Sequence, residues 1–392
     1  MKFWTSLPGL SRWPPASFSV PGANWQEHLS APDFQRIAAD ADRLGFDAIS
    51  VPEHVVLPRE LAGHLGGRWP DALTVMAFIA GATTRIRVNS GVIIAPLHNP
   101  VRLAKAIATL DVLSGGRVMV TFGAGMAPGE FSALGVDFSR RGRMMDEYIR
   151  AMKVLWTADE PEFHGEFVDF ADVVFEPKPV QRPHPPVFVG GRSVFALRRA
   201  ARLADGWAPS GAQGGTGPWL EGPSDLPRFL AEARRCEGFE QRERAFDIAM
   251  HAVPVLIGPD HRLADAAPRL TSTQQVIDLI ADLDAVGVTW TTVPPLGDGP
   301  QSLADHAEYL EWATAEVMPA VRRIHVQSAR SSTDWTRVNP AGIGTCGWAE
   351  SSRSVRRAIR HVPSSDRSRS RNSTSARLMR SGDSFIVHRI HP

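Results

Sequence analysis

Short apolar segments alternate with amphipathic segments along most of the chain. Eight of the apolar segments have the nearly continuous hydrophobic character that is typical of strands covered on both faces. These predicted strands are Lys2–Leu7, Ala48–Val51, Ile86–Ile94, Val118–Phe122, Val187–Gly190, Gly206–Ser210, Ala249–Ile257 and Thr289–Val293.

Amphipathic segments between these strands predict helices. From Asp33 to Leu44 the apolar residues recur at helical spacing, and Gly45 follows where a left-handed cap is favoured. Further helices are predicted over Pro100–Leu113 and Arg140–Thr157. Another is predicted after a capping box of Thr271 and Gln274, and Gly287 is expected to end it.

A repeated strand–helix order predicts a parallel sheet. Eight such units favour an α/β fold of the (β/α)8 barrel type, and a doubly wound open sheet is the alternative. Two insertions are expected, residues 8–32 after the first strand and residues 158–186 after the fourth helix. In the second insertion, EFHGEFVDF predicts a hairpin and EPKPVQRPHPP an extended connection.

Charge separates the barrel, residues 1–324, from a C-terminal tail, residues 325–392. The tail holds 12 arginines, no lysine and four acidic residues, so it carries +8 and the remainder −7 within a total of +1. Rich in serine and arginine and without periodicity, the tail is predicted to be disordered, with contact to RNA or anionic lipid as the alternative. The acidic barrel argues against nucleic acid as the main partner.

The remaining composition narrows the class of protein. The two cysteines, Cys236 and Cys346, lie in different regions and favour neither a disulfide framework nor a metal site. The first residues lack a signal-peptide pattern, and no run of about 18 apolar residues predicts a membrane span. We therefore expect a cytoplasmic protein with no membrane partner and no metal.

In a parallel barrel, the loops at the carboxyl ends of the strands build the active site. Pro52-Glu53-His54 follows the second strand, and glycine-rich loops follow the fourth, fifth and sixth. The GGRS loop precedes a helix, so its backbone and the helix N-terminus are suited to a phosphate group. An ordinary tight turn, a structural His54 and a solvated Glu130 are the alternatives. The chain contains no Walker A, G-x-S-x-G or H-E-x-x-H motif.

Five segments in this order give the chain a family resemblance: RLGFDAISVPEHVVLP, ATTRIRVNSGVIIAPLHNPVRLAKAIATLDVLSGGRVMVTFGAG, EFSALGVDFSRRGRMMDEYIRAMKVLW, EPKPVQRPHPPVFVGG and LRRAARLADGWAPSG. The chain resembles the luciferase-like flavin or deazaflavin oxidoreductases and monooxygenases, and within them the members that use coenzyme F420. The resemblance extends from about Met1 to Val321 and does not include the tail.

The resemblance implies a (β/α)8 barrel whose mouth binds a deazaflavin, with FMN as the alternative, and a homodimer. It implies a bulge with a cis peptide at Gly91–Val92 that supports the ring. The implied cofactor-binding residues are Gly91, Val92, Gly125, Met126, Gly190, Gly191 and Arg192. Ser90, Gly123 and Ser193 are further candidates because of their positions at the carboxyl ends of the predicted strands. The implied catalytic residues are His54 and Glu53. Glu130, after the fourth strand, is a further candidate, although the family often has a bulky residue and an acid where this chain has Met126-Ala127-Pro128-Gly129-Glu130.

Hydride transfer needs a nearby proton donor or acceptor, and an imidazole titrates close to neutrality. We therefore expect His54 to move the proton and Glu53 to orient its ring. The expected substrate is an alcohol, carbonyl or activated alkene, in a pocket for which Trp4, Trp25, Trp69 and Trp207 are possible walls. The alternatives are an FMN-dependent monooxygenase, a cofactor-binding protein without catalysis, and a flavin-free barrel lyase.

Overall fold

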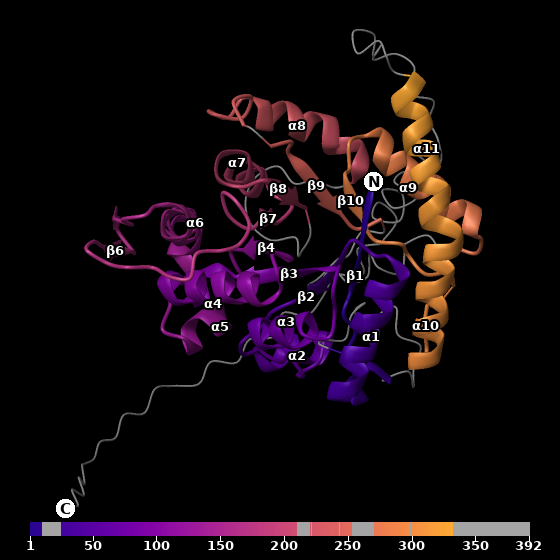
Figure 1. The fold of residues 1–392 in the computed structure, drawn as a ribbon, viewed down its shortest axis with the longest axis horizontal. Coiled ribbons are helices and arrows are strands. Elements are labelled where there is room, and N and C mark those ends of the chain that lie inside the picture. Colours follow the sequence, from indigo (N-terminus) through magenta and orange to yellow (C-terminus); the bar gives the residue numbers. More distant parts are fainter. Residues whose placement is uncertain are drawn as a thin grey trace, which may run out of the picture. The chain divides into compact units, whose positions relative to one another are not determined.

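The computed structural model describes residues 1–9, 25–209, 220, 222–242, 244–252, 270–297 and 299–331, with side chains described as far as His325 and that of His64 excluded. Eight parallel strands form a closed barrel in the order β1-β10-β9-β8-β7-β4-β3-β2 (Figure 1). Because β1 pairs with both β2 and β10, the sheet has no free edge. The predicted (β/α)8 barrel is confirmed, and the open sheet is wrong.

The barrel strands follow the predicted order. They are β1 Lys2–Ser6, β2 Ala48–Val51, β3 Arg87–Ile94, β4 Val118–Gly123, β7 Val187–Gly190, β8 Gly206–Ala208, β9 Asp247–Met250 and β10 Trp290–Thr291. Strands β2 and β7 have the predicted bounds, whereas β9 begins two residues earlier than expected and β10 is shorter. Ser210 and residues 253–257, at the ends of two predicted strands, lie outside the described residues.

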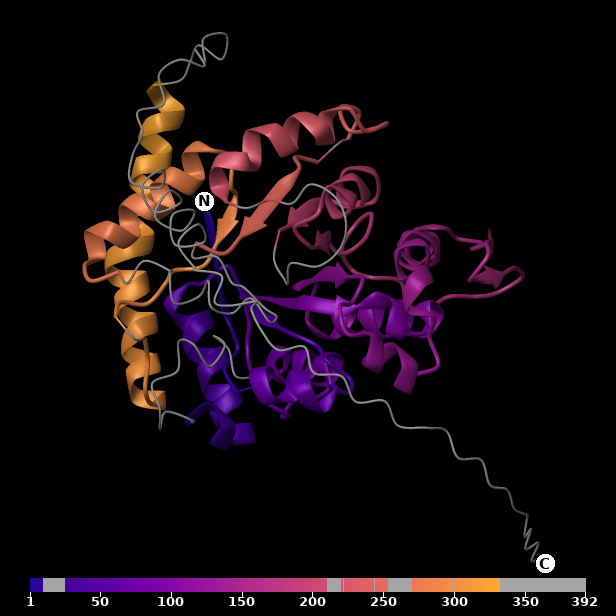
Figure 2. The same cartoon turned by 180° about the vertical axis from the view of Figure 1, so that it is seen from behind.

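Helices lie around the outside of the barrel (Figures 1 and 2). They are α1 Ala31–Leu44, α2 Arg59–Leu65, α3 Ala72–Ala80, α4 Pro100–Leu113, α5 Pro128–Ala133, α6 Arg141–Thr157, α7 Val194–Leu203, α8 Leu226–Arg234, α9 Thr273–Ala285, α10 Leu303–Trp312 and α11 Met318–Ser331. Single turns of 3-10 helix occur at η1 Trp25–His28, η2 Ala95–Leu97, η3 Phe138–Arg140 and η4 Pro223–Asp225, and a π-helical turn at Ala313–Val317.

Helix ends show how local sequence sets the element bounds. Gly45 closes α1 in a left-handed conformation with φ 92°, as predicted. The predicted capping box of α9 was wrong by one residue: the Ser272 hydroxyl accepts the Gln275 N–H, and the Gln275 side chain accepts the Ser272 N–H. Both pairs have the required spacing of three residues, and the start of the helix at Thr273 makes Ser272 the cap.

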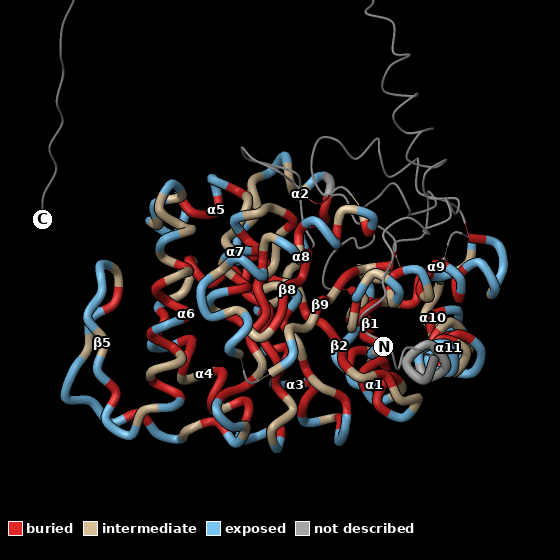
Figure 3. Tube along the Cα trace, turned by 90° about the horizontal axis from the view of Figure 1, so that it is seen from above, coloured by how far each residue is buried: buried red, intermediate tan, exposed pale blue. Residues whose placement is uncertain are grey.

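The barrel interior is filled by side chains from several strands. Figure 3 shows the barrel strands as buried and the outer faces of the helices as exposed. Trp4, Ala48, Met119, Phe188 and Trp290 form one packed cluster that joins β1, β2, β4, β7 and β10. All residues of β2 and β4 are buried. Burial on both faces explains why these strands read as continuous apolar runs rather than as alternating patterns.

The insertion after α6 contains the predicted hairpin, formed by β5 Phe163–His164 and β6 Asp169–Phe170. The buried carboxylate of Glu147 in α6 holds it by accepting the N–H groups of Glu166, Phe167 and Val168 at 2.6–3.0 Å. Residues 171–186 contain no helix, as the prolines predict. Most of the first insertion, residues 10–24, lies outside the described residues.

The predicted boundary after Ile324 lies inside α11, which continues to Ser331. His325 packs against α9, with Nδ1 2.9 Å from both carboxylate oxygens of Asp284. Residues 325–331 therefore continue the last helix of the barrel unit, although their composition places them with the tail. The rest of the predicted tail, residues 332–392, lies outside the described residues.

Candidate functional site

The bulge predicted on the third strand is present in β3. The pairing register between β3 and β4 shifts between Gly91 and Ile93, and the Gly91–Val92 peptide bond is cis, as the resemblance implied. Gly91 is exposed and Val92 is half-buried. A Cβ atom at Gly91 would lie 2.0 Å from the hydroxyl oxygen of Ser50, so a larger residue there would have to displace the Ser50 side chain. The bulge thus presents a side-chain-free peptide at the mouth of the barrel.

Two glycines on neighbouring strands make room for Val92. A Cβ atom at Gly123 in β4 would lie 2.6 Å from a methyl carbon of Val92, and one at Gly190 in β7 would lie 2.7 Å from the other. Sequence reasoning explained these glycines by close approach of a ligand. The structure gives them a packing role, which is to let the Val92 side chain lie across both strands.

Ser90 joins β3 to β4. Its hydroxyl accepts the Thr121 N–H at 2.9 Å and donates to the Thr121 carbonyl at 3.1 Å, and the residue is fully buried. Both hydrogen-bonding functions of the side chain are therefore used within the sheet. These contacts give Ser90 a role within the sheet, and its expected contact with the cofactor stays a prediction.

His54 and Glu130 meet in a buried contact at the carboxyl ends of β2 and β4. His54 Nδ1 lies 3.0 Å from Glu130 Oε2, and the other carboxylate oxygen accepts the Val55 N–H at 2.7 Å. His54 is 9% exposed and Glu130 is 0% exposed. Two points of attachment hold the carboxylate, so it fixes the ring of His54. Among the described residues, His54 Nε2 has no hydrogen-bond partner.

The neighbouring Glu53 contacts a different histidine. Its carboxylate accepts the Ile94 N–H at 2.7 Å and lies 3.0 Å from His98 Nε2, and the residue is 5% exposed. The prediction that Glu53 orients His54 is therefore wrong. Glu53 instead fixes the backbone of β3 just after the bulge.

The electrostatics of this second pair favour a charged imidazole. Burial lowers the pKa of His98, but the hydrogen bond to Glu53 and its charge, with a smaller contribution from Asp71, outweigh that effect and raise the pKa. His98 ends the short η2 helix and precedes α4. The two acids that sequence reasoning grouped with His54 thus contact different histidines. Glu130 contacts the imidazole of His54, and Glu53 contacts the imidazole of His98.

The loop after β4 contains Gly125, whose φ of 84° favours glycine. A Cβ atom there would lie 2.5 Å from the Phe131 ring, so the loop packs tightly on α5. Met126, in the same loop, is half-buried. The predicted contact of these two residues with the cofactor stays a proposal.

The loop after β7 is also held within the protein. The Gly191 N–H donates to the Ala208 carbonyl at 3.0 Å, and the Gly191 carbonyl accepts the Trp207 indole N–H at 2.8 Å. Arg192 is 5% exposed and its Nε donates to the Leu220 carbonyl at 2.8 Å. Ser193 caps α7 by accepting the Ala196 N–H. The loop is preorganised, and the prediction that it binds a phosphate remains a proposal.

Two of the four tryptophans that were expected to line a pocket pack against histidines that follow barrel strands, and their role as walls stays a prediction. Trp69 packs edge-on against the His54 ring, with centroids 4.7 Å apart and planes at 88°. Trp4 packs edge-on against His251, 5.2 Å away. The other two support the fold instead, because the Trp25 indole N–H donates to the Pro300 carbonyl and Trp207 is fully buried.

Sequence reasoning missed His98 and His251 as site residues. His251 directly follows β9, and burial lowers its pKa to about 4. The rule that identified His54, a polar residue just after a barrel strand, did not find His251 because the predicted strand Ala249–Ile257 contained it, whereas β9 ends at Met250. Within the described residues, no group of three or more potential ligands could hold a metal ion. The helices in the described part of the chain are too short or too polar to cross a bilayer.

Comparison with known proteins finds relatives that match part of the barrel. The profile of the luciferase-like monooxygenases matches residues 16–220. An FMNH2-dependent dimethylsulfone monooxygenase from Pseudomonas putida is 35% identical over 181 residues, 45% of this chain and 48% of that protein. An F420-dependent glucose-6-phosphate dehydrogenase from Amycolatopsis mediterranei is 31% identical over 192 residues, 48% of this chain and 56% of that protein. The match thus spans about half the length of these curated relatives.

Solved structures share the barrel. The monooxygenase RslO1 from Streptomyces bottropensis superposes with a TM-score of 0.63 at 23% identity, over 81% of this chain and 99% of that one. An F420-dependent secondary alcohol dehydrogenase, solved with an F420–acetone adduct, gives a TM-score of 0.59 at 19% identity, over 82% of this chain and 99% of that one. At these identities the likeness shows the fold.

Proposed function

Because the chain belongs to the luciferase-like monooxygenase family, we propose that it is an oxidoreductase that transfers hydride between coenzyme F420 and a small organic substrate. The observation that carries the proposal is the buried contact of His54 with Glu130 at the barrel mouth. Moving hydride to or from an alcohol or carbonyl requires a proton acceptor or donor beside the reacting carbon. The F420-dependent relative at 31% identity supports the choice of cofactor.

The residues at the mouth fit a flat tricyclic ring. Gly91 exposes a peptide without a side chain, and the half-buried Val92 beside it offers an apolar surface. Val92 is supported from below by Gly123 and Gly190, so its position is fixed before any ligand binds. We propose that this bulge supports the ring and that the loops at Gly125–Met126 and Gly190–Ser193 hold the phosphate-bearing tail.

When bound, the deazaflavin supplies a carbon atom that accepts or donates hydride. The chain supplies the proton chemistry. In a neutral His54 the proton lies on Nδ1 if that nitrogen donates to the Glu130 carboxylate, which leaves a lone pair on Nε2. Nε2 then takes the proton of a substrate hydroxyl, and Glu130 stabilises the resulting imidazolium. In the reverse direction the imidazolium returns the proton to a carbonyl oxygen.

The second candidate is an FMN-dependent monooxygenase. The FMNH2-dependent relative at 35% identity favours it, and the same bulge would support either ring. In that case His54 would exchange a proton with the substrate that is oxygenated, rather than with an alcohol or a carbonyl. A cytoplasmic homodimer stays a prediction for both candidates.

Binding and oxygen reactivity separate these candidates. The purified protein is titrated with oxidised F420 and with FMN, and a panel of alcohols, carbonyls and activated alkenes is then tested for F420 reduction or oxidation. We expect F420 binding and F420-linked turnover. Binding of FMN alone, with rapid reaction of the reduced form with oxygen, would favour the monooxygenase. Tight binding without turnover would favour a non-catalytic cofactor-binding protein, and binding of neither compound would favour the flavin-free lyase.

A further inference from the structure

The segment Gly66–Trp69, which follows α2, lies at the barrel mouth beside His54. The Trp69 indole N–H donates to the Gly66 carbonyl at 3.0 Å, so a hydrogen bond joins the last residue of the segment to the first. The Trp69 ring contacts the His54 imidazole edge-on at 4.7 Å between centroids. His54 is therefore held by two elements that are far apart in the sequence, Glu130 in α5 and Trp69 after α2.

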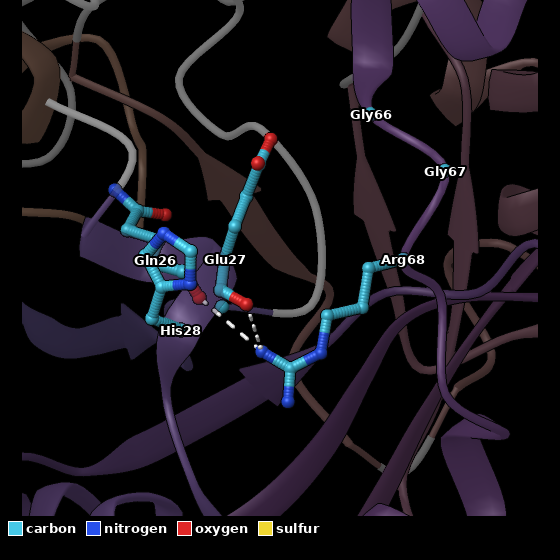
Figure 4. A pocket seen from close by; sticks show the side chains of 7 residues that line it. Gln26, Glu27, His28, Gly66, Gly67 and Arg68 are labelled. Atoms are coloured by element: carbon cyan, nitrogen blue, oxygen red, sulfur yellow. Dashed lines mark hydrogen bonds between the residues drawn. The ribbon is translucent and has the colours of Figure 1, made fainter. Parts of the chain in front are cut away.

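Arg68 connects this segment to the residues that follow β1. One guanidinium nitrogen donates to the Glu27 carbonyl at 3.0 Å and to the Gln26 carbonyl at 3.4 Å, and the other donates to the Leu29 carbonyl at 2.6 Å. The guanidinium also lies over the Phe34 ring, 5.5 Å from its centroid. Figure 4 shows Arg68 reaching across to the end of η1, with dashed lines to the carbonyls of Gln26 and Glu27.

A cavity of about 330 Å³ borders this contact. It is lined by Gly9, Gln26, Glu27, His28, Gly66, Gly67 and Arg68 (Figure 4). The two walls of the cavity are therefore the segment after β1 and the segment after α2, and Arg68 spans them. Without that span, the described contacts between these walls would be lost and the Trp69 segment could move relative to His54.

We propose that Arg68 and Trp69 are positioning residues that fix the imidazole of His54 for the proton step. This inference rests on the proposed function in taking His54 as the group that moves the proton. Trp69 limits rotation of the ring, and Arg68 fixes Trp69 by attaching its segment to three backbone carbonyls. The planar fork of arginine reaches carbonyls in different directions with fixed geometry, whereas lysine offers a single point charge. Neither residue touches the cofactor in this proposal.

The variants Arg68→Lys, Arg68→Ala and Trp69→Phe test the proposal, and Arg59→Ala is the matched control. Arg59 is an exposed arginine at the start of α2 and takes no part in the contacts described. Arg68 is also exposed, so its variants should fold. Circular dichroism and cofactor affinity should match the unmodified protein in all four.

The first readout does not depend on activity. The imidazole signals of His54, assigned with His54→Gln, are followed by nitrogen-15 NMR against pH. We expect the Arg68 and Trp69 variants to show a changed titration or tautomer ratio for His54, and Arg59→Ala to show neither. Signals that are identical in all variants would overturn the proposal, whether or not any redox activity is found.

The second readout is single-turnover hydride transfer with F420 and a substrate from the panel. Misplacement of a catalytic group by about 1 Å costs up to roughly 100-fold, so we expect a fall of about tenfold or more in the Arg68 and Trp69 variants, with a displaced pH profile. Arg68→Lys should not restore the rate. Altered His54 signals together with no turnover in the unmodified protein would support the positioning role and overturn the proposed function. Unchanged rates and pH profiles in an active enzyme would overturn the positioning role alone.

Discussion

The pair of Glu53 and His98 makes the stability of this barrel depend on pH. In His98→Gln, the buried Glu53 carboxylate keeps the Ile94 N–H but loses the imidazole 3.0 Å away. Removing one partner of a buried ion pair costs about 3–5 kcal/mol, and a hydrogen bond to a charged group contributes about 1.5–3 kcal/mol. Because the His98 side chain is 20% exposed, we expect about 2–3 kcal/mol of destabilisation at pH 6.

The direction of the pH dependence follows from the raised pKa of His98. The unfolded chain has an ordinary histidine pKa of about 6.5, so the folded protein binds this proton more tightly. The stabilisation by the charged pair is fully present below that value and is lost as the pH rises through the raised folded-state pKa. Above it, a neutral imidazole can still donate one hydrogen bond to Glu53, which contributes about 1 kcal/mol.

The assay is urea unfolding followed by tryptophan fluorescence at pH 6 and pH 9, for the unmodified protein and for His98→Gln. The destabilisation should be larger at pH 6 than at pH 9 by about 1–2 kcal/mol. Arg43→Gln is the control, because it removes a surface ion pair with Asp40 in which the arginine side chain is 61% exposed. Such pairs contribute about 0–1 kcal/mol, with no change between these pH values. Equal destabilisation by His98→Gln at both pH values would refute the reasoning.

Three further predictions concern the site and the last helix. His54→Ala should keep the fold and most of the cofactor affinity but slow single-turnover hydride transfer by roughly 100-fold, and an unchanged rate and pH profile would make His54 only a wall of the pocket. Gly191→Val should weaken F420 binding about tenfold or more, because φ at Gly191 is 121° and a Cβ atom would lie 3.1 Å from Ala196. Unchanged affinity in a folded variant would remove this loop from the site. Truncation after Ser331 should leave the melting temperature and cofactor affinity unchanged. Truncation after Ile324 should lower the melting temperature, because it removes the contact of His325 with Asp284. Equal melting temperatures for the two truncated proteins would show that residues 325–331 add no stability.

The sequence by itself determined the barrel. A strand that is buried on both faces has a short, nearly continuous run of apolar residues in the sequence. A helix with one buried face has apolar residues at helical spacing. The order of strands and helices can therefore be predicted from the sequence alone. The cap at Gly45 and the bounds of α4 Pro100–Leu113 were predictable because helix ends depend on neighbouring residues. The capping box at Ser272 was misplaced because two overlapping pairs satisfied the same spacing.

The bulge at Gly91–Val92 came from the family resemblance rather than from propensity or periodicity. Residues directly after β2 and β4 were expected at the mouth because strand direction in a parallel barrel decides which end they occupy. His54 and Glu130 both lie there, as that rule predicts. The same rule missed His251, because the predicted strand Ala249–Ile257 contained that residue and only the structure ends β9 at Met250.

Only the tertiary structure decided which acid serves which histidine. Glu53 is adjacent to His54 in the sequence, yet it contacts His98, while Glu130, 76 residues away, contacts His54. Partners of this kind depend on how separate loops converge at one end of the barrel, and no local pattern records that geometry. The packing of Gly123 against Val92 is likewise a contact between strands, and its cause is the side chain across from it rather than its own neighbours in the chain.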